Sequence, residues 1–500
     1  MNSSPPFSRP QEKLSRHLGL LGLTATGICS MIGASVYVVP FMIQRSVPGI
    51  GPYVIPAFLF AAVPAVLAAF AYAILASAMP RAGGSYIFAS RGLHPYLGYV
   101  ASFSQWFGLS MAIGVVAYVI IPFLRDMALA LEFTALADTL SHGSVRLVLA
   151  LLFLWVFVFI NVLGIKAYEK ALIPLMLLMF GLGFIVIITG FLFDHTDFYA
   201  AILLRENQVI PPAPVVSFQP SVFLAASAIL FSSFIGFDSI AQAGGEARNP
   251  GKYLPLAIGL AVVIVSLYYF SFTSAVYHAV PWNFIAAEAA KGDITAPGVL
   301  RYLIPTGWNV AIIGGAAIAL TNDLPAMLLA VSRLVFAWSA DGIFPKGLSK
   351  IHVRYHSPHR ALLLSGAMAS VGIFGCHFAG DFFLGVDLMV LSMLVNFLLM
   401  CITVITLPFY NPELAKEISV ITSRWKQLVL AGAGVIFLSG FLIIHIIKDI
   451  STPVESWYFR STPVWIIVMA IGTGIYLVEI RKLKASGTDL KKLFKKLPDE

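Results

Sequence analysis

The chain has 500 residues, of which 59% are hydrophobic and only 11% are charged, and it carries a net charge of +8. Soluble domains carry about 25% charged residues, so this chain cannot cover its surface with solvated side chains and needs lipid around much of it. The positive charge does not indicate nucleic-acid binding, because membrane proteins gather lysine and arginine on their cytoplasmic side. The composition predicts an all-α integral membrane protein.

Apolar runs recur along the chain, and each is close to the roughly 20 residues that a helix needs to cross a bilayer. Their unbroken apolar character favours helices over the alternating strands of a membrane β-barrel. The sequence predicts 12 transmembrane helices, at 18–43, 53–79, 95–124, 145–165, 167–193, 218–244, 252–280, 307–339, 360–378, 382–408, 426–447 and 462–480.

The basic residues indicate the orientation of these spans. With the N-terminus in the cytoplasm, 23 lysines and arginines fall on the inner side and 8 on the outer side, while Arg333 lies within the eighth span. This bias favours an even number of spans with both termini cytoplasmic, so that 1–17 and 481–500 are inner tails. In the second tail, lysines interleave with apolar residues, which suits a short helix on an anionic leaflet or a plain solvated tail.

Two of the spans, the first and the sixth, are interrupted by small residues. The first contains Gly33-Ala34-Ser35, and the sixth contains Phe234-Ile235-Gly236-Phe237 after two serines. Open backbone is tolerated in a membrane only where it lines a cavity. The half-helix ends would offer N–H groups to a carboxylate and carbonyl groups to an ammonium or a cation, and an amino acid carries both groups. Close helix packing is the alternative interpretation of each interruption.

The interrupted spans occupy corresponding places in the two halves of the chain. Residues 18–193 and 218–408 hold five predicted spans each, and because five is odd the second half is inverted in the membrane. Corresponding interruptions in inverted halves point to a transport site at the interface between the halves.

Several motifs occur in an order typical of one family. They are Met79–Tyr86 after the second span, Phe234–Asp238 with Glu246–Pro250 in the sixth, and Ser332–Ala337 with Asp341–Pro345 at the end of the eighth. These motifs resemble those of the amino acid–polyamine–organocation (APC) superfamily. The resemblance runs from about 18 to 408 and more weakly through the last two spans.

The resemblance implies a leucine-transporter-like 5+5 inverted repeat with broken helices 1 and 6, two peripheral helices at 426–480, and secondary transport by alternating access. The amides of residues 33–35 would bind the substrate carboxylate, three carbonyls of the breaks would bind its ammonium, and two phenylalanines with spans three, eight and ten would wall its side-chain pocket. The implied substrate-binding residues are Gly33, Ala34 and Ser35 for the amides, Met31, Ser232 and Ile235 for the carbonyls, Phe234 and Phe237 for the wall, and Gly236.

The chain departs from the family pattern at several positions. Ser35 stands where the superfamily usually has glycine, and its hydroxyl could bind the carboxylate or its bulk could narrow the pocket. Ser232 stands where the arginine/agmatine exchangers place a gating tryptophan, which argues against such an exchanger. The absence of lysine between Ala171 and Phe193 matches poorly with the proton-coupled members that carry a lysine in the fifth helix.

Four polar residues of the spans are candidates for ion coupling. Asp238 could carry a proton or could hold the unwound sixth helix. Thr321, Asn322 and Asp323 lie midway along the eighth span, where sodium-coupled relatives of the fold bind sodium through oxygen ligands. Asn322 and Asp323 could instead form an interhelical hydrogen bond. We expect Arg333 to lie at the inner end of the same span and to snorkel towards water.

The predicted function is secondary active transport of amino acids. No acid beyond Asp238 obviously marks a cationic side-chain pocket, so a neutral or aromatic amino acid is favoured. A polyamine or cationic amino acid transporter or exchanger is the alternative, and a non-transporting amino acid sensor is the alternative from another class. No catalytic or metal-binding motif is present, so we expect no enzyme, no cofactor and no metal site. The expected partners are the substrate, H⁺ or Na⁺ and the lipid of the plasma membrane.

Overall fold

The structure is a computed structural model that describes residues 14, 16–379, 383–451 and 456–498, so that most of the predicted tail at 1–17 lies outside the described residues. The described residues form helices and no β-strand, apart from two isolated bridges. Eleven of the helices are long and apolar enough to cross a membrane. The chain is therefore a multi-span helical membrane protein.

These eleven helical segments coincide with the second to twelfth predicted spans. Long apolar runs form continuous helices here because a helix satisfies its own backbone hydrogen bonds in lipid. The segments are α4 (Val54–Ala78), α6 (Pro95–Ala130), α8 (Gly143–Val162), α9 (Ile165–Leu192), α11 with η2 and α12 (Pro220–Gln242), α13 (Pro250–Ala279), α16 (Thr306–Ala340), α17 (His359–Ala379), α18 (Phe383–Tyr410), α20 (Arg424–Ser451) and α21 (Ser461–Ala485).

The first predicted span is not one helix, which is why eleven long segments are found and not twelve. It is divided into α1 (Leu20–Met31), α2 (Ala34–Tyr37) and α3 (Val39–Ser46). Short helices occupy most of the connections: η1 (Gly51–Tyr53), α5 (Gly84–Gly92), α7 (Thr134–Ser141), α10 (His195–Glu206), η3 (Gly244–Glu246), α14 (Trp282–Lys291), α15 (Ala296–Leu300), η4 (Lys346–Ser349), α19 (Pro412–Lys416), η5 (Trp457–Phe459) and α22 (Leu490–Leu493).

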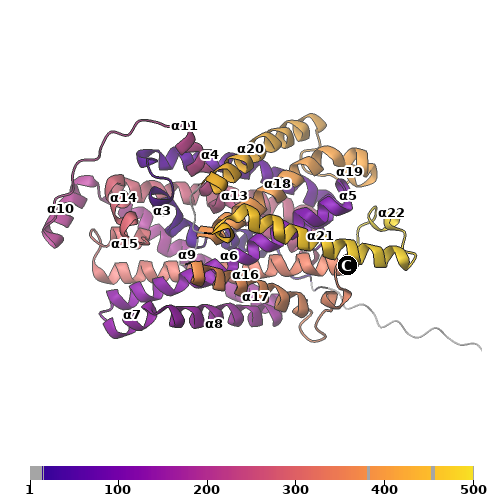
Figure 1. Cartoon of the computed structure of the whole chain (residues 1–500), viewed down its shortest axis with the longest axis horizontal. Coiled ribbons are helices and arrows are strands. Elements are labelled where there is room, and N and C mark those ends of the chain that lie inside the picture. Colours follow the sequence, from indigo (N-terminus) through magenta and orange to yellow (C-terminus); the bar gives the residue numbers. More distant parts are fainter. Residues whose placement is uncertain (1–13, 15, 380–382, 452–455, 499–500) are drawn as a thin grey trace, which may run out of the picture.

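The long helices differ in how deeply they are buried. In their most apolar stretches, 89% of α6 and 83% of α16 lie inside the bundle, against 22% of α8 and of α21. α6 and α16 run side by side through the middle of the bundle (Figure 1). On α8, large apolar side chains at successive turns, including Val148, Leu152 and Val156, are exposed and would contact lipid. The core that can hold a buried site is therefore built around α6 and α16.

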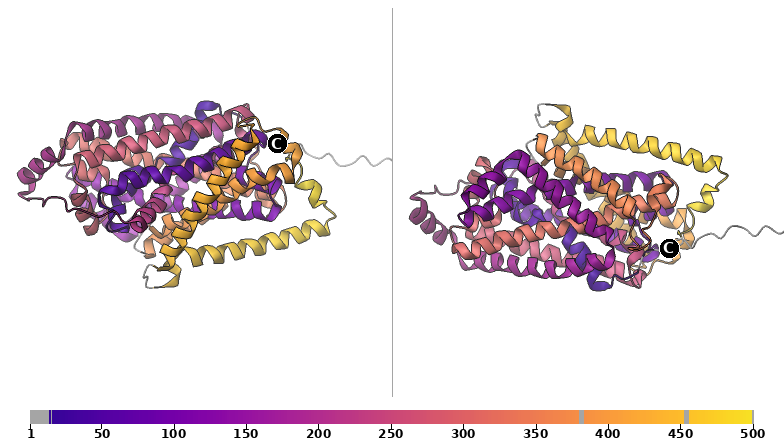
Figure 2. Two further views of the ribbon diagram at one scale, coloured as in Figure 1. Left: turned by 90° about the horizontal axis from the view of Figure 1, so that it is seen from above. Right: turned by 90° about the horizontal axis from the view of Figure 1, so that it is seen from below.

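The last two long helices lie at the edge of the bundle. α20 packs against α4 and α18, and α21 extends along one flank in both views of Figure 2. α10 and α22 lie at opposite ends of the long axis (Figure 1). At the start of α10, the backbone N–H groups of Thr196 and Asp197 donate to the carboxylate of Asp194, and these hydrogen bonds lower the pKa of that carboxyl.

The basic C-terminal tail packs against the body of the protein. The ring of Phe494 is buried, with the guanidinium carbon of Arg91 5.4 Å from its centroid. Two further hydrogen bonds hold the tail: Nδ2 of Asn411 donates to the carbonyl of Lys495 at 3.0 Å, and Nε of Arg81 donates to that of Pro498 at 3.0 Å. Basic residues that the sequence assigns to the inner side thus meet at one end of the bundle.

Candidate functional site

The first predicted span is broken inside the bundle. α1 ends at Met31, Ile32 leaves helical geometry with φ −93° and ψ 89°, and α2 begins after Gly33. A Cβ atom at Gly33 would lie 2.2 Å from Oδ2 of Asp323 on α16, so the carboxylate would have to move to admit a side chain there. The freed carbonyl of Met31 accepts a hydrogen bond from the hydroxyl of Tyr269 at 2.6 Å. The break therefore exposes backbone polar groups within the protein interior.

The sixth segment is broken as well. The helix α11 (Pro220–Leu230) passes into the 3-10 turn η2 (Phe231–Phe234), Ile235 is extended, and α12 (Asp238–Gln242) starts two residues after Gly236. Gly236 has a φ of +137°, which glycine alone adopts without strain. A Cβ atom at Gly236 would lie 2.2 Å from the carbonyl oxygen of Ser30 in α1. The two breaks are therefore in direct contact.

Hydrogen bonds hold the two broken segments together on either side of this contact. The hydroxyls of Ser30 and Ser239 lie 2.8 Å apart. At the start of α1, the N–H of Leu18 donates to the carbonyl of Glu246 at 3.0 Å, and the N–H of Arg248 donates to the carbonyl of Leu18 at 2.8 Å. These bonds fix the register of the first segment against the sixth.

A cavity of about 70 Å³ lies between the two breaks and the helices α6, α16 and α18. Its wall is mostly aliphatic, with three polar side chains. The residues that line it are Met31, Val38, Val39, Ala112, Val115, Val116, Val119, Ile235, Met327, Val386 and Met389, together with Ser30, Ser232 and Asp323. The cavity therefore suits a small molecule with an aliphatic part and a polar end.

Asp323 is the one carboxylate among these lining residues. It is 5% exposed, and within the described part of the chain its Oδ1 atom is buried without a hydrogen-bond partner. Burying a polar atom without a partner is costly, and more so for a charged group. Such an atom needs a partner that the described residues do not supply, such as a proton, an ion, a water molecule or a ligand.

The structure brings some of the predicted substrate-binding residues to this cavity and leaves others away from it. Met31, Ser232 and Ile235 line the cavity, and Gly33 and Gly236 lie at the breaks beside it. Ala34 and Ser35 belong to α2, but their side chains lie outside the described part of the chain.

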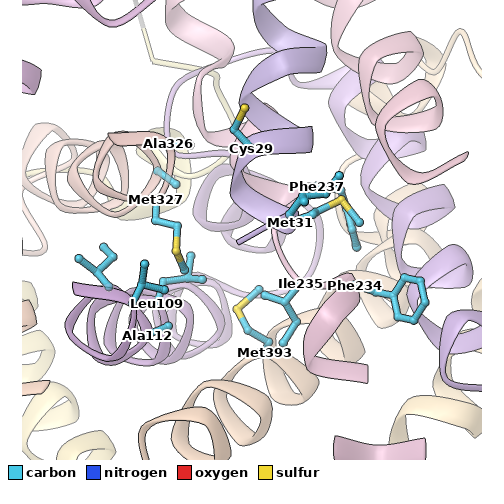
Figure 3. Close-up of a cluster of buried hydrophobic side chains, with 14 of the residues drawn as sticks. Cys29, Met31, Leu109, Ala112, Phe234, Ile235, Phe237, Ala326, Met327 and Met393 are labelled. Atoms are coloured by element: carbon cyan, nitrogen blue, oxygen red, sulfur yellow. The ribbon is translucent and has the colours of Figure 1, made fainter. Parts of the chain in front are cut away.

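The two predicted aromatic wall residues do not line the cavity. The ring of Phe234 packs on Phe58, with centroids 5.0 Å apart, and the ring of Phe237 stacks on Phe397 at the same distance. In Figure 3, Met327 and Ala112 lie on one side of Ile235, and the ring of Phe234 points away from them. The lining comes from the two broken segments and from α6, α16 and α18, which are the third, eighth and tenth predicted spans.

Asp238 is fully buried, and hydrogen bonds occupy both of its carboxylate oxygens. The N–H of Gly236 donates to Oδ1 at 3.1 Å, and the side-chain amide of Gln105 on α6 donates to Oδ2. The side-chain oxygen Oε1 of Gln105 accepts hydrogen bonds from Nε2 of Gln242, at 3.1 Å, and from the hydroxyl of Ser85. These contacts favour the role of holding the broken sixth helix over the role of carrying a proton.

Thr321 and the Nδ2 atom of Asn322 also have hydrogen-bond partners, whereas Oδ1 of Asn322 is buried without one in the described part of the chain. The hydroxyl of Thr321 donates to the carbonyl of Ala317 in its own helix at 2.7 Å. Nδ2 of Asn322 donates to Sγ of Cys29 on α1 at 3.0 Å, which is an interhelical contact. Only Asp323 of this trio lines the cavity. In the described part of the chain, no three His, Cys, Asp or Glu side chains gather as metal ligands.

One expectation for the eighth span is wrong. Arg333 does not snorkel: it is 2% exposed, and its guanidinium donates two hydrogen bonds to the carboxylate of Glu246. The sequence did not reveal this pair, although a lone arginine in a span is itself a signal that a carboxylate lies nearby. The valines of α6 were not named either, because nothing in their sequence separates them from valines that face lipid.

Comparison with known proteins is consistent with this architecture. The branched-chain amino acid permease BcaP of Bacillus subtilis is 26% identical over 377 residues, which cover 72% of this chain and 75% of that protein. The methylthioribose transporter of the same species is 24% identical over 477 residues, 94% of this chain and 95% of that protein. The human cationic amino acid transporter 4 is 25% identical over 387 residues, 73% of this chain and 56% of that protein.

These relatives are transporters by name, and they differ in the substrate that the name gives. The family model for amino acid permeases matches residues 18–471, a range that includes both broken segments and every helix that lines the cavity. Since this match extends over most of the chain, the protein belongs to the amino acid permease family of the APC superfamily.

Proposed function

We propose that this protein is a secondary active transporter that carries a neutral, aliphatic amino acid across the plasma membrane by alternating access. The observation that carries the proposal is the contact between the two breaks, with Gly236 against Ser30, beside a small aliphatic cavity that contains a buried carboxylate. Broken helices at a buried site are the usual construction of carriers, because open backbone in a membrane is tolerated only around a cavity.

The 5+5 inverted repeat is part of this proposal. Its halves are residues 18–193 and 218–408, followed by helices 11 and 12 at 426–480. The breaks in the first segment of each half support the repeat. In the proposed site, the amides of Gly33, Ala34 and Ser35 bind the substrate carboxylate at the positive end of a half-helix.

The cavity wall supports an aliphatic substrate over an aromatic one. Its apolar lining consists of valine, isoleucine, alanine and methionine side chains, which suit contact with a branched aliphatic side chain. The name of the permease BcaP, a relative of similar length, points in the same direction.

Transport is proposed to be coupled to H⁺ or Na⁺. Among the four candidate residues, Asp323 faces the cavity, whereas Asp238, Thr321 and Asn322 are engaged in hydrogen bonds that hold helices in place. Both termini are proposed to be cytoplasmic. The gathering of Arg81, Arg91 and the basic tail at one end of the bundle supports this orientation.

The proposal is tested with the purified protein in proteoliposomes. We expect valine, leucine or isoleucine inside the vesicles to drive the uptake of labelled valine, and we expect saturation and preference for the L form. Uptake that is driven by a pH gradient in the absence of sodium would identify H⁺ as the coupled ion. Uptake that needs sodium and ignores a pH gradient would identify Na⁺.

The same assay separates the alternatives. Binding of amino acids without counterflow would identify a sensor, and uptake without saturation or stereoselectivity would identify a channel. Counterflow by lysine or polyamines alone would favour the cationic alternative, to which the resemblance to cationic amino acid transporter 4 also points.

A further inference from the structure

We infer that the carboxylate of Asp323 is the group that pairs with the ammonium of the substrate, and that the site therefore selects a substrate with one ammonium and an aliphatic side chain. This inference rests on the proposed function, since it concerns the same cavity. It assigns the recognition of the amine to a side chain of α16, and not to the backbone carbonyls of the two breaks alone.

The position of Asp323 supports this role. Its Oδ2 atom lies so close to the first break that a Cβ atom on Gly33 would be 2.2 Å away, and its Oδ1 atom has no partner in the described part of the chain. The side chain is 5% exposed and lines the cavity. It therefore faces the point where the open backbone of the first segment begins.

Other buried carboxylates of the protein have partners, which sets Asp323 apart from them. Asp238 accepts from Gln105 and from the backbone of Gly236, as described above. Glu246 accepts from Arg333, and Asp341 forms an ion pair with Arg91 at 2.6 Å. A carboxylate buried without a counter-charge is costly in a membrane protein, so a positively charged ligand gains affinity by supplying that charge.

Two of the three predicted carbonyls, those of Met31 and Ser232, are already engaged. The carbonyl of Met31 already accepts from the hydroxyl of Tyr269 at 2.6 Å, and that of Ser232 already accepts from the N–H of Ile235 at 3.2 Å. A carbonyl can accept a second hydrogen bond, and its bond from an ammonium is charge-assisted too, but only a carboxylate also supplies the opposite charge. Asp323 is therefore a stronger acceptor for the ammonium than the carbonyls of Met31 and Ser232.

The remainder of the cavity defines the substrate class. The lining includes Ala112 and three valines of α6, and Asp323 is the one charged side chain in it. A second ammonium, as in lysine or a diamine, would lie against aliphatic groups without a counter-charge. The site therefore takes monoamines such as the branched-chain amino acids and excludes substrates with a cationic side chain.

The first test uses wild-type protein and three probes of the same shape. These are L-valine, isobutylamine, which is valine without its carboxylate, and isovalerate, which is valine without its amine. In competition against labelled valine, we expect isobutylamine to compete and isovalerate not to compete at the same concentration. Competition by isovalerate that equals or exceeds that of isobutylamine would overturn the inference.

The second test compares Asp323→Asn with Asp126→Asn, which makes the same chemical change at a partly exposed residue paired with Arg125. Asp323→Asn removes one partner of the proposed buried charge pair, so we expect valine affinity to fall by about 30-fold or more. We expect no change in valine affinity for Asp126→Asn. Because Oδ1 of Asp323 has no partner within the described residues, we expect Asp323→Asn to fold and to keep its melting temperature in detergent.

Failure of this inference and failure of the proposed function give different results. If Asp323→Asn binds valine as tightly as wild type while wild type performs counterflow, the inference is wrong and the transporter stands. If valine binding to wild type depends on Asp323 but no counterflow occurs, the assigned residue stands and the transport function is wrong.

Discussion

Arg333 and Glu246 form a buried ion pair that joins the end of the sixth segment to α16. The Nε and Nη2 atoms of the guanidinium donate to the two carboxylate oxygens, and both side chains are 2% exposed. The neighbouring Nη1 donates to the hydroxyl of Ser332 at 2.8 Å. A forked pair of this kind fixes both distance and orientation. It therefore holds η3, which also binds the start of α1 through Leu18, against the central helix.

Glu246→Gln is expected to destabilise the protein by about 3–5 kcal/mol, because it leaves the guanidinium of Arg333 buried without its counter-charge. The measurement is thermal unfolding in detergent, with wild type as reference. The double variant Glu246→Gln with Arg333→Met, which removes both charges, should recover most of the loss. Equal melting temperatures for Glu246→Gln and wild type would show that the pair does not stabilise the fold.

Gly236→Ala is expected to abolish valine counterflow and to lower the yield of folded protein. The φ of +137° costs a residue with a Cβ atom about 1–3 kcal/mol, and that Cβ would lie 2.2 Å from the carbonyl oxygen of Ser30. Since this atom is backbone, the two breaks must move apart to admit it. The measurement is counterflow together with size-exclusion chromatography of the purified protein.

Gly259→Ala in α13 is the matched control for this variant, because a Cβ atom there meets no other atom within 4 Å. It should transport like wild type. If both alanine variants transported like wild type, the close contact between the breaks would not be needed for function.

The spans could be predicted well because the length of a run of apolar residues is read from neighbouring positions in the sequence. α4 and α9 begin and end within two residues of the predicted limits. The breaks were also predictable, since glycine and serine at the middle of a span leave a visible interruption. The single span predicted at 18–43 is divided into three helices in the structure. Its local sequence does not show where α2 ends and α3 begins.

The site was harder to predict because its contacts join distant parts of the chain. Phe234 and Phe237 were expected to wall the pocket, yet the helical period that decides which face a side chain takes does not continue through a 3-10 turn and an extended residue. The partner of Arg333 lies 87 residues away. The packing of α12 against α16 brings Glu246 to it.

Val116→Ala should change which amino acid the carrier prefers. Val116 lines the aliphatic wall of the cavity, and removing two methyl groups leaves valine with fewer contacts while making room for a longer side chain. One methylene in an apolar pocket changes discrimination by about 10–200-fold, so the preference for valine over a larger apolar amino acid should fall by about tenfold or more. Competition against labelled valine measures this ratio.

Val148→Ala is the control for Val116→Ala, since Val148 lies on the exposed face of α8 and is 58% exposed. It should leave the substrate preference unchanged. Equal preferences for wild type and Val116→Ala would place the substrate's side chain elsewhere.

Phe494→Ala should release the C-terminal tail while leaving the helical bundle folded. The ring is 2% exposed and lies against Arg91, so its removal loses both apolar burial and a desolvated cation–π contact worth about 2 kcal/mol. Amide hydrogen exchange of residues 490–498 should then speed up by about 30-fold or more, with no change in α6 or α16. Arg91 keeps its ion pair with Asp341, so its own position should not change.

Lys491→Ala, at an exposed position of α22, should leave the exchange of the tail as in wild type. Fast exchange of residues 490–498 in wild type itself would show that the tail does not rest on Arg91.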